Sequence, residues 1–200
     1  SCGCGHEKSK TELFVERIAK PINAIKGYDL PVSAFNGYED GTFENGTSAF
    51  EKRGIAVHVP EWKAENCIQC NQCSYVCPHA VIRPFLMTEE EKAASPVELT
   101  TIKPVGKGLE GLQYRMQVST LDCTGCGSCV NVCPGKKNKE TGEVEKALTM
   151  ANMEANAGEQ TFFDFGREIP VKPEVVAKFK ETTVKGSQFK QPLLEFSGAC

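Results

Sequence analysis

The chain has 200 residues, of which 40% are hydrophobic and 24% charged, as is typical of a globular protein of one or two domains. Its formal net charge is −3 and no third of it is strongly basic, which argues against nucleic acid and anionic membranes as partners. No apolar run is long enough to span a membrane, and no signal-peptide pattern is visible at the N-terminus. We therefore expect a cytoplasmic location.

The first ten residues, 1–10, match no pattern that we can place. They contain Cys2, Cys4 and His6, whose spacing is compatible with metal binding but fits a frayed chain end better.

Residues 11–60 are predicted to form a connecting segment. Hydrophobic residues recur at helical spacing from Thr11 to Lys26, which predicts a helix that Pro21 would split in two. The segment is rich in turn formers and too short to be an independent domain. Its other predicted elements are an extended stretch at 30–35, turns at 36–48 and a short strand at 55–59.

The eleven cysteines are the outlying feature of the composition. Eight of them form two clusters with the same spacing, C-x2-C-x2-C-x3-C-P, and the second cluster follows the first by 56 residues. A valine precedes and a proline follows the last cysteine both times, so we infer a duplicated unit with approximate two-fold symmetry. The eight cysteines are Cys67, Cys70, Cys73, Cys77, Cys123, Cys126, Cys129 and Cys133.

This repeat lies in a predicted domain at residues 61–158, in which each cysteine loop is followed by a short helix and a strand. Residues 88–111 are predicted to be a surface insertion that begins with a solvated helix at Glu89. Prolines interrupt residues 159–200, which we expect to be a connector with a few short elements. Strands are predicted at 80–87, 112–120 and 147–152.

The cysteine spacing is typical of iron–sulfur ligation. Three closely spaced thiolates wrap one cubic cluster, and the fourth, at the start of a helix, reaches the cluster of the other repeat, as in two-cluster bacterial ferredoxins. We therefore predict two [4Fe–4S] clusters and an α+β fold of that ferredoxin type, built from duplicated β-loop-α-β units. The predicted ligands are Cys67, Cys70, Cys73 and Cys133 for cluster one, and Cys123, Cys126, Cys129 and Cys77 for cluster two.

Other uses of the cysteines explain the pattern less well. Structural zinc typically takes two separated pairs of cysteines. An odd number of cysteines without an export signal argues against a disulfide framework.

Several neighbours of the cysteines have a predicted role. Gly125 and Gly127 would let backbone N–H groups approach the sulfurs, and Trp62 would pack near the first cysteine loop. His58 and His79 are isolated, and packing or surface roles suit them better than a role at a cluster, although His79 would lie near cluster two. We find no catalytic pair of residues. A dry shell is expected from Ile68, Tyr75, Val76, Ile82, Leu121, Val130, Val132 and Leu148.

Seven short segments carry a further signal: LPVSAF, DGTF with a later GT, EKRGIA, CIQCNQCSYVCPHAVIR, DCTGCGSCVNVCP, VKGSQF and EFSGAC. In this order, from about Thr11 to Cys200, they resemble the pyruvate:ferredoxin (flavodoxin) oxidoreductases. Many proteins share the ferredoxin-type motifs, whereas EKRGIA, VKGSQF and EFSGAC are more specific.

The resemblance implies an electron-exit segment of an enzyme that converts pyruvate and coenzyme A to acetyl-CoA and CO2. The full enzyme of that family also uses thiamine diphosphate, Mg²⁺ and a third, proximal [4Fe–4S] cluster, and it passes electrons to ferredoxin or flavodoxin. Cys200 matches the first cysteine of the proximal-cluster motif. Residues 11–35 resemble the end of an upstream domain, and 159–200 a connector toward the thiamine-binding domain. The chain alone is expected to carry electrons without oxidising pyruvate.

Two other interpretations stay open. A free-standing two-cluster electron carrier would need neither the insertion at 88–111 nor the tail after residue 158, so both segments argue against it. A purely structural metal scaffold would be colourless and would show no reversible reduction.

Overall fold

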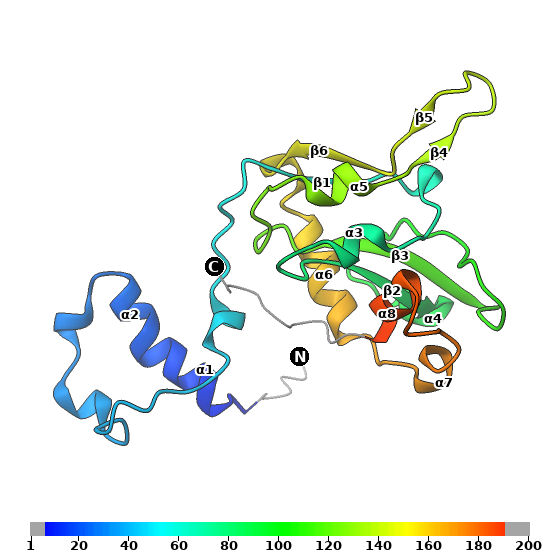
Figure 1. The fold of residues 1–200 in the computed structure, drawn as a ribbon. Helices are drawn as coiled ribbons and strands as arrows, with labels where there is room; N and C mark the ends of the chain where they lie inside the picture. The colour runs from blue at the N-terminus through cyan, green and yellow to red at the C-terminus, as the bar shows by residue number, and fades with distance from the viewer. Residues whose placement is uncertain (1–6, 191–200) are drawn as a thin grey trace. The chain divides into compact units, whose positions relative to one another are not determined.

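The computed structural model describes residues 7–190, so Cys2, Cys4, His6 and Cys200 lie outside the described part. The chain divides into two compact units, residues 1–52 and 53–200 (Figure 1). Along residues 7–190, none of the helices combines the length and apolarity that a membrane crossing demands.

The first unit begins with a helical stretch that Pro21 does not split, contrary to the sequence-based expectation. Ser9 caps it, because its hydroxyl accepts a hydrogen bond from the Glu12 N–H at 3.2 Å. A π-helical turn lies just before the proline, and this wider turn accommodates a residue that has no N–H to donate. The stretch consists of α1 (Lys10–Phe14), the π turn (Val15–Ala19) and α2 (Lys20–Asn23).

The predicted extended stretch at 30–35 is wrong for its last four residues. Pro31 is extended, but Val32–Phe35 forms a 3₁₀ turn that continues the compact path of this unit. Three aromatic rings pack together within this unit. The ring centroids of Phe14, Tyr38 and Phe43 lie 5.3–5.6 Å apart.

The second unit mixes short helices with strands that form three antiparallel pairs within residues 53–190. Its strands are β1 (His58–Trp62), β2 (Ile82–Thr88), β3 (Leu112–Val118), β4 (Lys136–Lys137), β5 (Val144–Glu145) and β6 (Leu148–Asn152). Its α-helices are α3 (Gln72–Tyr75), α4 (Glu89–Ala93), α5 (Ser128–Val132), α6 (Glu159–Glu168), α7 (Pro173–Val176) and α8 (Val184–Lys190).

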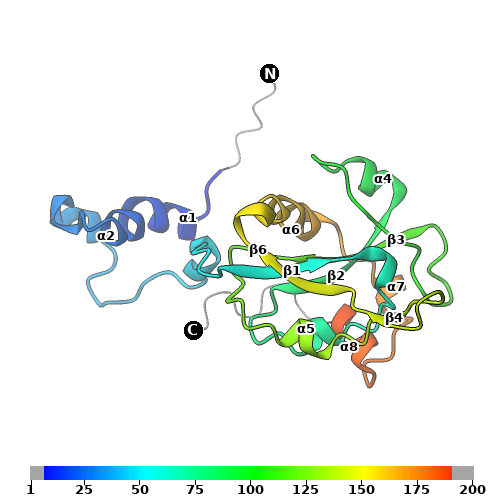
Figure 2. The ribbon, with the colours of Figure 1, turned by 90° about the horizontal axis from the view of Figure 1, so that it is seen from above.

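Two of the strand pairs lie side by side and form the centre of this unit. β1 pairs with β6, with Trp62 opposite Leu148, and β2 pairs with β3, with Ile82 opposite Val118. Helix α6 covers one face of the strands, while α5 and α8 lie on the other face (Figure 2). The third pair, β4 and β5, is an exposed hairpin.

Three of the four predicted strands are confirmed, as β2, β3 and β6. The strand predicted at 55–59 is wrong in its bounds, because β1 starts only at His58 and runs through Pro60 to Trp62. Proline is compatible with this strand because, within residues 7–190, β1 pairs with β6 alone, and a free edge needs no N–H from the proline.

The insertion at 88–111 is more than a surface excursion. It begins with the predicted helix, α4, capped by the Thr88 hydroxyl and the Glu91 carboxylate. However, Leu99 and Leu109 are buried, and Ile102 forms a bridge to Tyr114 of β3. The burial of these apolar side chains stabilises the folded loop and offsets the conformational entropy that it loses.

The segment after 158 packs against the strands instead of acting as a loose connector. Phe163 of α6 is 1% exposed and meets Phe85 of β2 edge to face, with ring centroids 6.0 Å apart. Helix α8 contacts α3 and β2. The described part of this segment, up to Lys190, therefore contributes to the core of the second unit.

Candidate metal centres

The eight cysteines of the two repeats line two separate cavities. The first is lined by Cys67, Cys70, Cys73 and Cys133 together with apolar side chains. The second is lined by Cys123, Cys126, Cys129 and Cys77. Each cavity thus combines three cysteines of one repeat with the fourth cysteine of the other.

The sulfurs are spread around each cavity. Within residues 7–190, no three Cys, His, Asp or Glu side chains converge on a point that a single metal ion could occupy. A cubane makes a different demand, because its four thiolates bind four separate irons at the corners of the cluster. Four cysteines around an apolar cavity suit that demand.

The two cysteine loops have the same backbone conformation at equivalent positions. In the second loop, Gly125 and Gly127 have positive φ angles of 73° and 75°. In the first loop the residues 56 positions earlier, Gln69 and Asn71, have φ angles of 58° and 60°. The left-handed residues turn each loop so that its successive cysteines face the same cavity. The second left-handed residue of each loop, Asn71 or Gly127, lies directly before α3 or α5.

The first loop uses its two left-handed residues as anchors. The buried Gln69 side chain donates to the Lys103 carbonyl and accepts from the Val105 N–H, both at 2.8 Å. The Asn71 side chain donates to the Lys185 carbonyl at 3.0 Å and accepts from the Tyr114 hydroxyl at 2.8 Å. These bonds attach both the insertion and α8 to the loop that carries the first three cysteines.

Burial and crowding raise the pKa of four of these thiols, those of Cys67, Cys73, Cys123 and Cys129. Burial raises the pKa of Cys129 to about 12, and the neighbouring Cys123 and Cys77 add to the effect. Burial also raises the pKa of Cys73 well above its usual range, and Cys67 and Cys70 act in the same direction. Iron supplies the positive charge that thiolates in such a cavity need, so metal binding and proton release are coupled.

Polar groups around the second cavity favour the thiolate form. The Gly125 N–H donates to the Cys123 sulfur at 3.4 Å, as the glycine prediction requires. The Cys126 sulfur lies 3.5 Å from the Ser128 hydroxyl, and the backbone N–H and hydroxyl of Ser128 lower the pKa of Cys126. Donors of this kind tune the potential of a bound cluster.

The first cavity contains an indole N–H instead. Trp62 lies on its wall, where the sequence places it, and its ring meets Tyr114 edge to face at 6.3 Å. Among the described residues, the buried Nε1 has no partner in hydrogen-bonding geometry. Burial raises the pKa of Cys67, and the Trp62 N–H lowers it and so offsets part of this increase.

The predicted dry shell is confirmed only in part. Ile82 and Leu148 are each 1% exposed, but Ile68 and Tyr75 expose 48% and 60% of their surface. Ile68 lies next to Cys67, and Tyr75 is the last residue of α3, two positions after Cys73. His79 is buried on the wall of the second cavity, whereas His58 is exposed.

A buried polar network behind the first loop is absent from the sequence-based analysis. Arg83 of β2, 1% exposed, donates to the side chain and backbone oxygens of Gln188 at 3.4 and 3.2 Å. The Ser74 hydroxyl donates to the same Gln188 side chain at 2.8 Å. Only the VKGSQF motif, which contains Gln188, pointed to this part of the chain.

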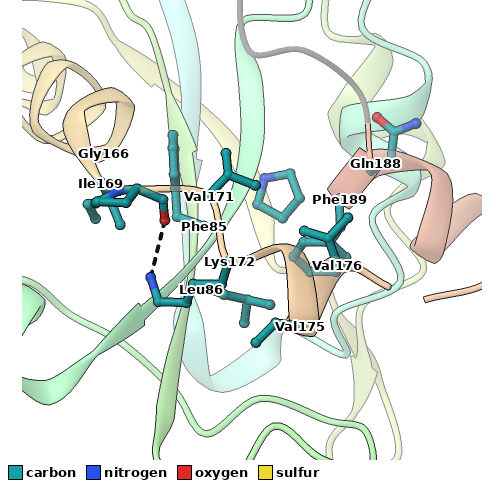
Figure 3. A pocket seen from close by; sticks show the side chains of 12 residues that line it. Phe85, Leu86, Gly166, Ile169, Val171, Lys172, Val175, Val176, Gln188 and Phe189 are labelled. Atoms are coloured by element: carbon teal, nitrogen blue, oxygen red, sulfur yellow. Dashed lines mark hydrogen bonds between the residues drawn. The ribbon is translucent and has the colours of Figure 1, made fainter. Parts of the chain in front are cut away.

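A third cavity has no cysteine in its walls (Figure 3). Its walls are mainly apolar and come from β2, the end of α6, α7 and α8, and its Lys172 turns back toward the Pro170 carbonyl at 3.3 Å. It has no titratable cluster that would support chemistry of its own.

Comparisons with known proteins agree with this geometry. The family described as a 4Fe-4S dicluster domain matches residues 66–137, which contain all eight cysteines of the cavities. A domain of unknown function named EKR matches residues 5–56 and so begins within the stretch that the sequence analysis left unplaced.

Longer relatives match almost the whole chain. The pyruvate:ferredoxin oxidoreductase of Moorella thermoacetica is 52% identical over 188 residues, which are 94% of this chain. The pyruvate-flavodoxin oxidoreductases of Enterobacter agglomerans and Klebsiella pneumoniae are 47% and 48% identical over 96% and 94% of the chain. In each case the match covers 15% of the relative.

This chain is homologous to one segment of the pyruvate oxidoreductases. The predicted resemblance is therefore confirmed. The dicluster domain also confirms two [4Fe–4S] clusters as the cofactors of the chain and electron transfer as their function.

Proposed function

We propose that the chain relays single electrons through two [4Fe–4S] clusters with crossed ligand sets. Cluster one would be held by Cys67, Cys70, Cys73 and Cys133, and cluster two by Cys123, Cys126, Cys129 and Cys77. The observation that carries this proposal is the division of the eight cysteines between the two cavities.

The strand pairing supports a duplicated, ferredoxin-like architecture. β1 and β3 begin the two repeats, and β2 and β6 end them. A two-fold rotation that exchanges the repeats converts the pair β1–β6 into the pair β3–β2, and both pairs occur as antiparallel pairs. An exchange of this kind brings the fourth cysteine of each repeat beside the other repeat's loop.

Within the whole enzyme, this segment would carry electrons away from pyruvate oxidation. By homology, the remaining domains would supply thiamine diphosphate, Mg²⁺ and a third [4Fe–4S] cluster, and would convert pyruvate and coenzyme A to acetyl-CoA and CO2. An external ferredoxin or flavodoxin would take the electrons. A cytoplasmic location suits this role, because thiols stay reduced there. The chain's own residues hold the clusters and exclude water from them.

A matched pair of variants tests the crossed ligand sets. Iron analysis of the cluster-loaded chain should give eight irons, and Cys77→Ala and Cys133→Ala should each lose about four. Anaerobic alkylation followed by mass spectrometry identifies the cysteines that become free. We expect Cys77→Ala to expose Cys123, Cys126 and Cys129, and Cys133→Ala to expose the first three cysteines of the other repeat. The opposite pattern of labelling would refute the crossed assignment.

A further inference from the structure

The indole N–H of Trp62 is a buried donor that the protein itself leaves unused. Its Nε1 is shielded from solvent and has no hydrogen-bonding partner among the described residues. A buried donor without a partner costs roughly 1–3 kcal/mol. The position therefore suits an acceptor stronger than a neutral thiol, such as the thiolate of a loaded cavity.

The wall around Trp62 offers few other acceptors. The side-chain oxygens of Gln69 and Asn71 are engaged by the Val105 N–H and the Tyr114 hydroxyl. Asn66 adds a third amide, whose nitrogen donates to the Lys146 carbonyl at 3.5 Å, and the rest of this wall is made mainly of cysteine sulfurs and apolar groups. Trp62 and Cys67 line the same cavity, so a thiolate of the bound cluster is the acceptor that this wall offers.

Arg115 makes the indole a stronger donor. Its guanidinium lies 5.6 Å from the centre of the Trp62 ring and is held at 2.8 Å by Glu159. A cation over the face of an indole draws electron density from the ring, which polarises the N–H bond. The second aromatic donor of the cavity, Tyr114, is already committed to Asn71.

We propose that Trp62 Nε1–H donates a hydrogen bond to a cluster-one sulfur at Cys67 and thereby raises the reduction potential of cluster one. The position related to Trp62 by the repeat is Val118, which has no donor to give to cluster two. Trp62 is thus a tuning residue that makes two similar clusters unequal. This proposal rests on the proposed ligand sets.

The sign follows from charge. A reduced cluster carries one more negative charge than an oxidised one, so a donor to its sulfur stabilises the reduced state more strongly. Loss of one such bond should lower the one-electron equilibrium constant for reduction about tenfold, which corresponds to about 59 mV.

The chain contains a single tryptophan, which allows an atom-level test. Biosynthetic replacement of tryptophan by benzothienylalanine keeps the bicyclic shape but puts a sulfur where the N–H was. Potentiometric titration with paramagnetic detection should show one midpoint about 59 mV lower and the other unchanged. The Cys70→Ala variant should lose cluster one, so the midpoint that is missing in this variant belongs to cluster one. Trp62→Phe provides a second route, since it also removes the N–H.

The same protein gives an independent readout. After exchange into D2O, the reduced unmodified chain should lose a strong proton coupling to cluster one, and the benzothienylalanine chain should lack that coupling from the start. Eight irons with unshifted midpoints in the substituted chain would overturn the role of Trp62 and leave the ligand sets standing. A content of four irons in the unmodified chain would instead overturn the proposed function.

Discussion

Two pairs of residues at equivalent positions of the repeats have the same left-handed backbone but different chemistry. Gly125 and Gly127 reach this conformation without strain, whereas Gln69 and Asn71 gain hydrogen bonds from side chains that glycine lacks. The second loop therefore adopts its shape because glycine tolerates positive φ angles. The first loop adopts the same shape because side-chain hydrogen bonds hold it to neighbouring segments.

The two glycines of the second loop should respond differently to alanine. Gly127→Ala would meet nothing within 4 Å and should cost about 1–2 kcal/mol of backbone strain. Gly125→Ala would also place its Cβ 2.9 Å from the His58 carbonyl oxygen, so the loop must shift away from cluster two. We expect Gly125→Ala alone to fall well below eight irons per chain. Equal iron contents in the two variants would contradict this steric argument.

The Gln69 side chain should hold the insertion in place. Gln69→Gly keeps the left-handed backbone available but leaves the Lys103 carbonyl and the Val105 N–H without their partners. The expected loss is about 1–3 kcal/mol, local to this loop. Hydrogen exchange should accelerate at the Val105 amide and stay unchanged at amides of the β4–β5 hairpin. An unchanged rate at Val105 would show that the insertion is held by other contacts.

At the scale of elements, helix α6 shows how a segment rich in loop residues still joins the core. Phe163 points into the cluster formed with Phe85, Met87 and Leu99, while Phe165 on the same helix is only half-buried. The helix is short, so its stability comes from this packing more than from intrinsic propensity.

Substitution of these two phenylalanines by alanine compares the loss of the same side chain at a buried site and at a half-buried site of α6. Phe163→Ala should cost about 3–5 kcal/mol, because it leaves a cavity between α6 and β2. Phe165→Ala removes the same atoms from a half-buried site and should cost clearly less. Native-state hydrogen exchange under anaerobic conditions, read at the slowest amides of β2 and β3, measures both. Similar costs would mean that α6 is not anchored through Phe163.

The sequence alone was sufficient for the cysteine clusters and for β2, β3 and β6, because metal-ligand spacing and strand alternation are local patterns. It was insufficient for β1, where Pro60 hid a strand that needs only one partner. The burial of Leu99 and Gln188 was equally invisible, since it depends on contacts between segments that are distant in the sequence. The Trp62 N–H illustrates the same limit: its neighbour Cys67 is close in sequence, but its lack of a partner is a property of the fold.

At the scale of the whole molecule, the clusters are expected to hold the second unit together. Its central helices and strands surround cavities that the clusters would fill, whereas the described part of the first unit, residues 7–52, contains no cysteine. Anaerobic removal of iron by a chelator should abolish slow hydrogen exchange in β1, β2, β3 and β6. Exchange in α1 and α2 should stay as it was. Persistent protection of the strands in the iron-free chain would show that the second unit folds without metal.

The crossing of the ligands also has a consequence during synthesis on the ribosome. In the proposed sets, cluster one needs Cys133, which is made 56 residues after Cys77. At about 5–20 residues per second, these 56 residues take roughly 3–11 seconds, during which Cys67, Cys70 and Cys73 wait for their missing partner. Neither cluster can be completed until the second repeat has emerged, so a nascent chain stalled between the repeats should bind no stable cubane. Iron delivery to this protein is then a late event, timed by translation of its second half.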